Sequence, residues 1–293
     1  AELMNRGSQE DAQEFLIHLL DSMHEEILEW NRIFGSKESI HLADLMINST
    51  DTDVGEQWEE VGRKGRAVVV RNPDAESVRT YVTALFGGML RSELRRAHAK
   101  PSVTKEPFMC LQLEIDRPIV KVLDDALRLF FEPESLEGYK SESTKEAVDA
   151  KKHFFIDRLP PILILQLKRF SYDSETQTLA KISKRISYPE ELYIQPSFFS
   201  SASLVPKKED RMYQLSAVVT HHGQELAGGH YTCDVRRKQE QQQRQQKQES
   251  MKMRDLKSTW VLCDDSKLIR ENSENVLHRQ AYLLFYSRHT IPT

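Results

Sequence analysis

One segment constrains the fold of this chain more than any other, a near-continuous apolar run from Ile162 to Leu167 that follows Pro160-Pro161. A strand exposed on one face alternates apolar and polar residues, whereas a strand covered on both faces is apolar at nearly every position. Gln166 is the single polar residue of the run. We therefore expect residues 162–167 to form a buried central strand.

Other stretches carry strand patterns. Residues 109–115 alternate apolar and polar residues, and Pro118 follows them, as expected where a strand ends. Four further candidates are Met212–Thr220, Tyr231–Val235, Trp260–Cys263 and Ala281–Tyr286.

Two stretches carry helical patterns. Apolar residues recur at helical spacing from Ser8 to about Trp30 and again from Val122 to Phe131. Ser8, with Asp11 three residues later, resembles a capping box at the start of the first helix. Because these helices and the strands do not alternate regularly, the sequence predicts an α+β fold over a doubly wound sheet.

Composition excludes several classes of partner. The formal net charge of -4 is too small to favour nucleic acid or an acidic membrane surface. No apolar run reaches the roughly 20 residues that a membrane-spanning helix needs. With 39% hydrophobic and 29% charged residues, the chain is typical of a soluble globular protein.

The three cysteines are few, odd in number and far apart, which favours a reducing compartment, the cytoplasm or the nucleus. The first residues carry no secretory signal. They also lack a starting methionine, so we expect the chain to begin within a longer protein.

Two stretches are expected to be loops or disordered insertions. Residues 35–80 are polar and mixed, with acidic and glycine-containing segments. Residues 236–258 are rich in Gln, Arg and Lys and hold almost no apolar residues before Met251, so they cannot bury a face. The alternative for the second stretch is a tract that binds a partner.

The candidate chemistry centres on Gly228-Gly229-His230-Tyr231. Glycines allow a close backbone approach, and His230 would lie at the start of a strand, where a base can meet a substrate. A neutral imidazole can accept a proton near pH 7 when a partner orients the ring, and Asp264 in the following strand is the natural partner. The alternative is an ordinary histidine beside a glycine turn. His221-His222 show no such partner, and we expect them in a loop or turn.

No cysteine is a convincing nucleophile for this base. Cys233 is three residues past His230 and would point to the opposite face of its strand. Cys263 directly precedes Asp264 and would also point away from it. Cys110 lies in an alternating apolar strand, far from the other motifs in sequence. We therefore expect all three cysteines to be structural.

Five ordered motifs carry a family resemblance. They are Gln9–Leu16, Phe86–Ser92, Leu159–Phe170, the Gly-Gly-His-Tyr segment and Asp264-Asp265. In this order they resemble the ubiquitin-specific proteases, the papain-like deubiquitinases. The resemblance covers nearly the whole chain and implies one catalytic domain over residues 1–293, shaped as a hand with palm and fingers and a truncated thumb. It also implies thiol-dependent hydrolysis of the isopeptide bond at the ubiquitin C-terminus, with ubiquitin and ubiquitinated proteins as partners and no cofactor.

The resemblance assigns roles to particular residues. His230 falls on the catalytic histidine and Asp264 on the third triad member, with Asp265 as a supporting carboxylate. Asp11, Glu14, Gly229 and Tyr231 fall where the family binds the ubiquitin tail. Two carboxylates at i and i+3 on one helix face suit arginine side chains. The alternative for Asp11 and Glu14 is acidic charge that stabilises a helix N-terminus.

Two departures from the family pattern stand out. The cysteine box, an Asn-x-Cys segment ahead of the glutamine box, has no counterpart in this sequence, so we expect the chain alone to be inactive. The zinc-binding Cys-x-x-Cys pairs are also missing: His98 stands alone after the first position, and Ser141 and Thr144 occupy the second. A lone histidine cannot hold zinc, so no metal is expected.

Three hypotheses follow from this pattern. The chain is part of an active deubiquitinase, or a catalytically inactive pseudoenzyme that binds ubiquitin, or a scaffold unrelated to ubiquitin. An Asn-x-Cys box in the upstream reading frame would distinguish the first from the second, and binding of ubiquitin would exclude the third.

Overall fold

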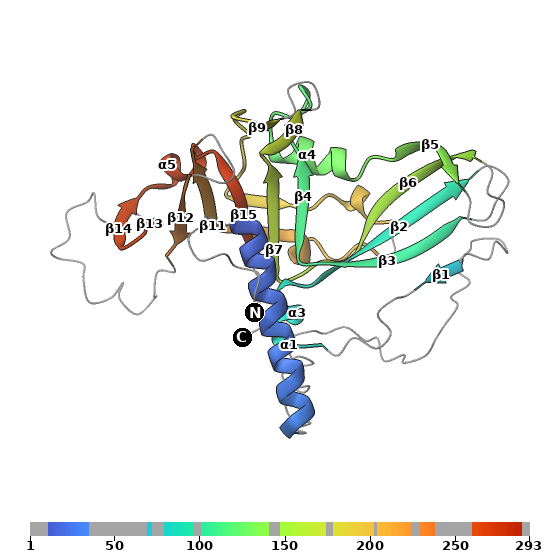
Figure 1. The fold of residues 1–293 in the computed structure, drawn as a ribbon, viewed down its shortest axis with the longest axis horizontal. Helices are drawn as coiled ribbons and strands as arrows, with labels where there is room; N and C mark the ends of the chain where they lie inside the picture. The colour runs from blue at the N-terminus through green and yellow to red at the C-terminus, as the bar shows by residue number, and fades with distance from the viewer. Residues whose placement is uncertain are drawn as a thin grey trace.

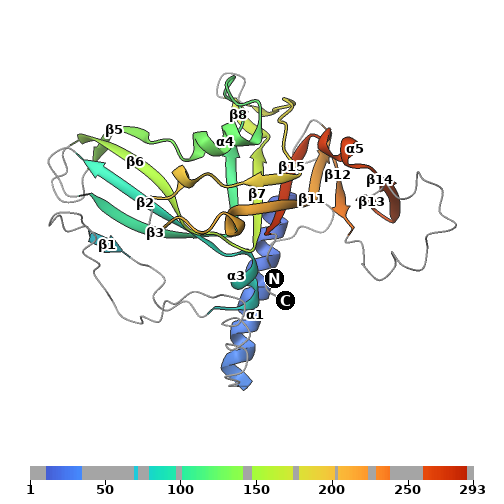
Figure 2. The same cartoon turned by 180° about the vertical axis from the view of Figure 1, so that it is seen from behind.

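A computed structural model describes the chain at residues 11–34, 69–71, 79–96, 101–140, 147–173, 178–201, 204–223, 229–237 and 260–288. In these parts two large sheets lie side by side, with helices on both faces of the larger one (Figures 1 and 2). The predicted α+β class is confirmed. No helix within these ranges is both long and apolar enough to cross a membrane.

The larger sheet has eight strands, with the order β14-β13-β12-β11-β15-β7-β4 and with β10 paired to β11. Their bounds are β4 Cys110–Glu114, β7 Ile162–Lys168, β10 Glu191–Tyr193, β11 Met212–His222, β12 His230–Arg236, β13 Trp260–Asp264, β14 Lys267–Glu271 and β15 Ala281–Arg288. β4 and β7 are parallel, and the other pairs are antiparallel. All six strands predicted from the sequence are therefore present.

The predicted buried strand is β7. Its burial is confirmed, but its predicted central position is wrong, because β7 lies next to the edge strand β4. Leu163, Ile164, Leu165 and Leu167 are each at most 1% exposed. Leu163, Leu165 and Leu167 contact the main hydrophobic cluster on one face, whereas Ile164 contacts a second cluster under α1 on the other face. Residues 162–167 of this strand are apolar except for Gln166 because both faces of the strand are covered.

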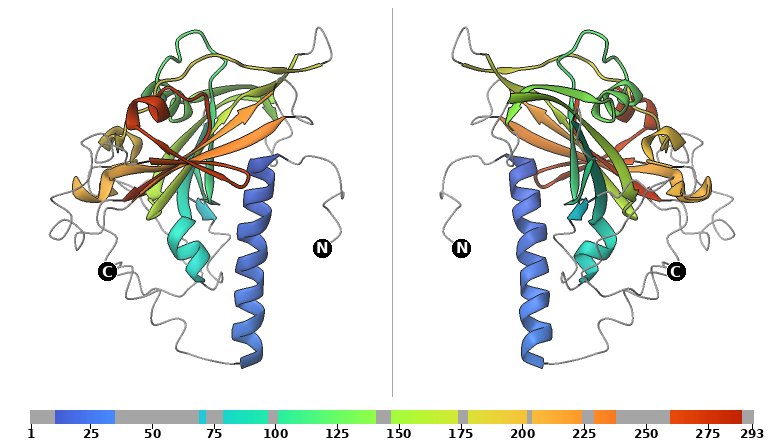
Figure 3. Two further views of the ribbon diagram at one scale, coloured as in Figure 1. Left: turned by 90° about the vertical axis from the view of Figure 1, so that its left-hand side faces the viewer. Right: turned by 90° about the vertical axis from the view of Figure 1, so that its right-hand side faces the viewer.

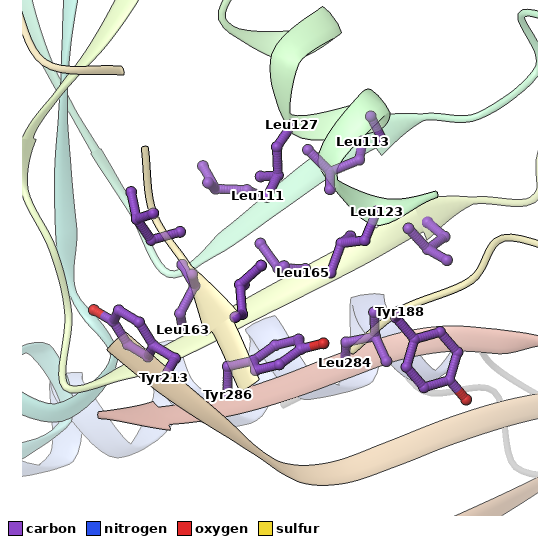
Figure 4. Packing of buried hydrophobic residues seen from close by; sticks show 14 of the residues in the cluster. Leu111, Leu113, Leu123, Leu127, Leu163, Leu165, Tyr188, Tyr213, Leu284 and Tyr286 are labelled. Carbon is purple, nitrogen blue, oxygen red and sulfur yellow. The ribbon is translucent and has the colours of Figure 1, made fainter. Parts of the chain in front are cut away.

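The main core lies between the larger sheet and α4, Leu123–Phe130 (Figure 4). Leucines of the helix and of β4 and β7 meet tyrosines whose hydroxyls reach backbone carbonyls. The hydroxyl of Tyr213 donates to Pro160 O at 2.6 Å, and that of Tyr286 donates to Pro189 O at 2.7 Å. These bonds let the large rings be buried without leaving a polar atom unpaired.

The smaller sheet extends away from the core, on the right in Figure 1. Its order is β1-β3-β2-β6-β5, with β1 Val69–Arg71, β2 Gly88–Arg96, β3 Ser102–Phe108, β5 Glu134–Lys140 and β6 Ala147–Arg158. A separate hairpin pairs β8 Phe170–Asp173 with β9 Thr178–Lys181. These strands show no clear pattern in the sequence, because many of their residues are charged and only partly buried.

The remaining helices are short. They are α3 Tyr81–Phe86, α5 Ser273–Leu277 and the 3-10 turns η1 Pro196–Phe198 and η3 Glu209–Arg211. α5 covers the end of the main core, where Val276 is fully buried beside Trp260.

The first helix, α1 Ala12–Phe34, begins later than predicted. Asp11 caps it: the carboxylate Oδ1 accepts from the amides of Gln13 at 2.9 Å and Glu14 at 3.1 Å. Ser8, predicted as the cap, lies outside the described residues, and the helical start at Ala12 contradicts it. The N-terminal half of α1 lies against β7 and β15, and the rest projects from the sheets (Figure 3).

Each of the two predicted insertions, residues 35–80 and 236–258, contains residues that belong to a strand. β1 lies inside residues 35–80, so the loop prediction is wrong for its three residues. Arg236 is the last residue of β12, where it pairs with Trp260 and binds Glu190 at 3.0 Å, so the second insertion cannot begin there. The remainder of both stretches, apart from residues 79–80 and 237, lies outside the described residues, as do His98, Ser141 and Thr144.

One buried cation joins the end of β7 to neighbouring segments. Arg169 is only 1% exposed. Its guanidinium donates to the carbonyls of Ala281 at 2.6 Å, Ile182 at 3.0 Å and Lys184 at 2.9 Å. Burial lowers the pKa of this guanidinium to about 10, which still leaves it charged at neutral pH.

Arg169→Met should lower the free energy of unfolding by about 3 kcal/mol, because it leaves three carbonyls without their donor. Urea denaturation followed by circular dichroism measures this change. Lys168→Met is the matched control: Lys168 is partly exposed and pairs with Glu114, so its loss should cost less than about 1 kcal/mol. Equal effects of the two substitutions would contradict the assigned role of Arg169.

Candidate active site

The strand register brings His230 and Asp264 together. β12 and β13 are antiparallel, with Cys233 opposite Cys263 and Asp234 opposite Leu262. Continued by one pair, this register sets Asp264 opposite Thr232, two residues from His230 on the same face. Diagonal neighbours of this kind lie within reach of long side chains.

The two side chains form a short hydrogen bond. His230 Nε2 lies 2.5 Å from Asp264 Oδ1, with about a third of each side chain or more exposed to solvent. The bond from His230 holds the pKa of the Asp264 carboxyl below its ordinary value. With Nε2–H donated to this carboxylate, Nδ1 keeps the lone pair that can accept a proton. The contact predicted from the sequence is therefore present.

The turn after β13 adds a second carboxylate. Asp264 pairs with Lys267 across a tight hairpin, and Asp265 takes a left-handed conformation with φ of 49°. Ligand atoms of His230, Asp264 and Asp265 all lie within 4.8 Å of one another, the only such group found in the described residues. Zinc sites in proteins use four ligands, or three and a water, and the short bond to Asp264 already engages Nε2 of His230. A carboxylate bonded to an imidazole in this way orients the ring for proton transfer.

A second histidine flanks His230. The prediction that His221-His222 lie in a loop is wrong, because they are the last two residues of β11. His222 lies opposite His230, their rings stack with centroids 6.0 Å apart, and His222 Nε2 is 2.8 Å from Thr232 Oγ1. Alternation continued from Thr220 would have placed His222 on this face.

Gly229 is required by packing. A Cβ atom at this position would lie 2.3 Å from the carbonyl oxygen of His222 and 2.4 Å from Nε2 of His221. His221 itself is 3% exposed, and Lys181 Nζ contacts its Nδ1 at 3.1 Å. Gly229 therefore lets the start of β12 approach the end of β11. Gly228 lies outside the described residues.

Asp11 joins α1 to the sheet beside this site. Its Oδ2 accepts from the hydroxyls of Tyr282 at 2.6 Å and Tyr231 at 3.3 Å, while Oδ1 caps the helix. The residue is 8% exposed, so its carboxylate is directed inward. Glu14, one turn later, is exposed. The roles of Asp11, Glu14, Gly229 and Tyr231 in binding a ubiquitin tail stay predictions.

The cysteines do not complete the site. Cys233 and Cys263 lie on the face of the sheet opposite to His230 and Asp264, because they are at odd spacing from them in β12 and β13. Cys110 contacts the cluster under α1. Burial raises the pKa of Cys110 to about 12 and that of Cys233 to about 11, so both stay protonated at neutral pH. A protonated thiol is a poor nucleophile.

The chain is similar to proteins of one family. The model of the family described as ubiquitin carboxyl-terminal hydrolase matches residues 1–286. Ubiquitin hydrolase B of Dictyostelium discoideum is 37% identical over 279 residues, 95% of this chain and 55% of the relative. Ubiquitin carboxyl-terminal hydrolase 10 of Rattus norvegicus is 33% identical over 303 residues, 98% of this chain and 35% of the relative. The chain thus spans about half the length of these curated relatives, or less.

Solved structures agree in fold. The SAGA Ubp8 DUB module bound to ubiquitin aldehyde is similar with a TM-score of 0.57 at 26% identity, over 75% of this chain and 45% of that one. Another structure of a Ubp8 DUB module reaches a TM-score of 0.62 over 97% of this chain and 51% of that one, at 22% identity, which shows the fold alone. The predicted ubiquitin-specific protease type of α+β fold is confirmed.

Gly229→Ala should lower the free energy of unfolding by about 1–3 kcal/mol, because the added methyl meets backbone that cannot move freely. It should also shift the NMR signals of the His230 ring. Gly138→Ala is the control: it strains a position with φ of 65° that has open space around it, so the His230 signals should stay in place. An unchanged His230 ring in Gly229→Ala would contradict the packing role.

Stability should fall as the pH drops below about 6.5. Burial lowers the pKa of His221 below the ordinary 6.5, and the charge of Lys181 lowers it further. Burial lowers the pKa of His222 in the same way, and His230 adds to that effect. As the pH falls, the unfolded chain binds protons before the folded chain does. The contribution of the two neutral histidines to the free energy of unfolding is therefore complete above pH 6.5 and is lost below it. Urea denaturation at about pH 7.5 and about pH 5.5 measures the slope. His222→Gln should reduce that slope, and an unchanged slope would exclude His222 as a contributor.

Proposed function

The chain belongs to the ubiquitin carboxyl-terminal hydrolase family, and we propose that it supplies the base and its orienting acid to a cysteine-type deubiquitinase. The nucleophilic thiol comes from a part of the complete protein other than the three cysteines of this chain. One observation carries the proposal: the 2.5 Å bond between His230 Nε2 and Asp264 Oδ1 at an exposed end of a strand.

The geometry supports a definite proton path. The incoming thiol gives its proton to His230 Nδ1, and Asp264 stabilises the imidazolium that forms. The thiolate attacks the carbonyl carbon at the ubiquitin C-terminus, and His230 returns the proton to the leaving lysine amine. Asp265 adds negative charge beside the pair without a direct bond to His230 Nε2. Water then releases ubiquitin from the thioester, again with His230 as the base.

The tail of ubiquitin is proposed to bind between α1 and β12. Glu14 is exposed at the first turn of α1 and can pair with an arginine of the tail. Asp11 acts beside it by holding Tyr231 and the start of the helix, since its own oxygens already accept four hydrogen bonds. Gly229 leaves room for the tail at the start of β12. A solved structure of the Ubp8 DUB module, which this chain resembles, is bound to ubiquitin aldehyde.

An apolar surface on α1 supports the need for a further segment. Six large side chains of this helix are 43–61% exposed: Phe15, Leu19, Met23, Trp30, Ile33 and Phe34. A contiguous exposed apolar stripe of this length is unusual for a free surface and marks a contact site. We propose that the segment bearing the thiol packs against this stripe, which begins one turn from Asp11.

The second candidate is a ubiquitin-binding protein without catalysis. The positions of the three cysteines favour it. Cys110, Cys233 and Cys263 all belong to the larger sheet, and none lies on the face of that sheet that carries His230. The three free thiols suit the reducing cytoplasm or nucleus in either case.

In the complete protein, His230→Ala should lower kcat/KM for cleavage of a ubiquitin fluorogenic amide by about 10³-fold or more, with ubiquitin affinity changed less than about twofold. Asp264→Asn should lower it by at least about 10²-fold, because the tautomer of His230 is no longer held. His278→Ala, an exposed histidine at the end of α5, is the matched control and should leave kcat/KM unchanged.

The two candidates then separate cleanly. Cleavage that survives His230→Ala would remove His230 from the mechanism. Binding of ubiquitin by the complete protein without any cleavage would select the inactive candidate, and absence of binding would exclude both.

A further inference from the structure

Two thiols face each other behind the candidate active site. Cys233 of β12 and Cys263 of β13 are directly opposite in the antiparallel register, and both are free and half-buried. Residues opposite in this way have Cβ atoms about 4.5–5.5 Å apart. A disulfide needs about 3.5–4.5 Å between the same atoms, so a small local closure of the two strands is enough to form one.

The surroundings make the two thiols unequal. Burial raises the pKa of Cys233 to about 11, and the neighbouring Cys263 and Asp234 add to the rise. Cys263 lies toward the open edge of the sheet, opposite Leu268, which is 73% exposed. Val235, which follows Cys233 on the same face, is 40% exposed. Small solutes can therefore reach this face next to Cys263, while Cys233 is held behind it as the thiol that closes the bond.

We infer that Cys233 and Cys263 form a thiol-oxidation site, at which a peroxide converts the pair into a cross-strand disulfide that weakens the His230–Asp264 contact on the opposite face. The regulatory part of this inference rests on the proposed function. Formation of the disulfide does not.

The chemistry balances with hydrogen peroxide as the oxidant. The Cys263 sulfur attacks one peroxide oxygen, which gives a sulfenic acid on Cys263 and one water. Cys233 then loses its proton as its sulfur attacks the Cys263 sulfur. The S–S bond forms, the S–O bond of the sulfenic acid breaks, and the leaving hydroxide takes up the proton of Cys233 as a second water. The two thiols lose two electrons in total, and the peroxide gains them.

The coupling follows from neighbouring positions. Asp264 is the next residue after Cys263, and Thr232, the residue before Cys233, lies opposite Asp264 when the register is continued. Drawing the Cβ atoms of the cysteines together brings β12 and β13 closer on the face of the sheet that carries the cysteines. The side chains on the other face then spread apart, and the 2.5 Å bond between His230 and Asp264 lengthens.

Disulfide formation is tested on this chain by treating it with hydrogen peroxide and mapping tryptic peptides by mass spectrometry. The expected product is a peptide pair joined through Cys233 and Cys263, with loss of two of the three thiols. Cys110, whose pKa burial raises to about 12, stays reduced. Cys110→Ser should give the same product, and Cys233→Ser should give none. Links through Cys110, links between molecules, or no loss of thiols would overturn the proposal.

The coupling is tested by NMR of the histidine rings before and after oxidation. The His230 signals should shift in the wild type, return with dithiothreitol, and stay fixed in Cys233→Ser. His18, exposed on α1, should not respond in any sample. A mapped disulfide without a change at His230 would overturn the coupling. Because neither readout requires catalysis, failure of the proposed function is recorded separately, by the ubiquitin cleavage assay.

Discussion

The register between β12 and β13 is the constraint on which the rest of the site depends. Side chains alternate between the faces of a strand, so a slip by one residue would exchange the His230–Asp264 face with the cysteine face. The register is secured at its far end by Trp260, which is fully buried against α5, and at its near end by the tight turn at Asp265. A structural core and a turn together thus determine one hydrogen bond.

A second constraint links the site to α1. The single carboxylate of Asp11 caps the helix and accepts hydrogen bonds from Tyr231 and Tyr282, so helix, β12 and β15 meet at one residue. A long helix that rests on the sheet only near its N-terminal half needs such an anchor. These contacts bury Asp11, which is 8% exposed, and its predicted role in binding an arginine stays untested.

The sequence was informative wherever a residue's role depends on local pattern. The apolar run of β7 and the strands β11, β12, β13 and β15 were predictable, since burial on one or two faces determines residue type. The contact of His230 with Asp264 was predictable from the ordered motifs. Prediction failed where contacts with segments distant in the sequence determine the structure. The strands of the smaller sheet have too many charged residues for a clear strand pattern. The sequence also gave no sign that Asp11, the cap of α1, binds two tyrosines more than 200 residues away.

By itself, the sequence determined the class of fold, the family of the chain and the contact of His230 with Asp264, because these depend on periodicity and on ordered motifs. Only the tertiary structure decided that His222 stacks on His230, that Gly229 is needed for the approach of His221, and that Cys233 faces Cys263. The physical reason is the same in each case. Contacts across strands depend on register, and register arises from packing and turns that no single segment encodes.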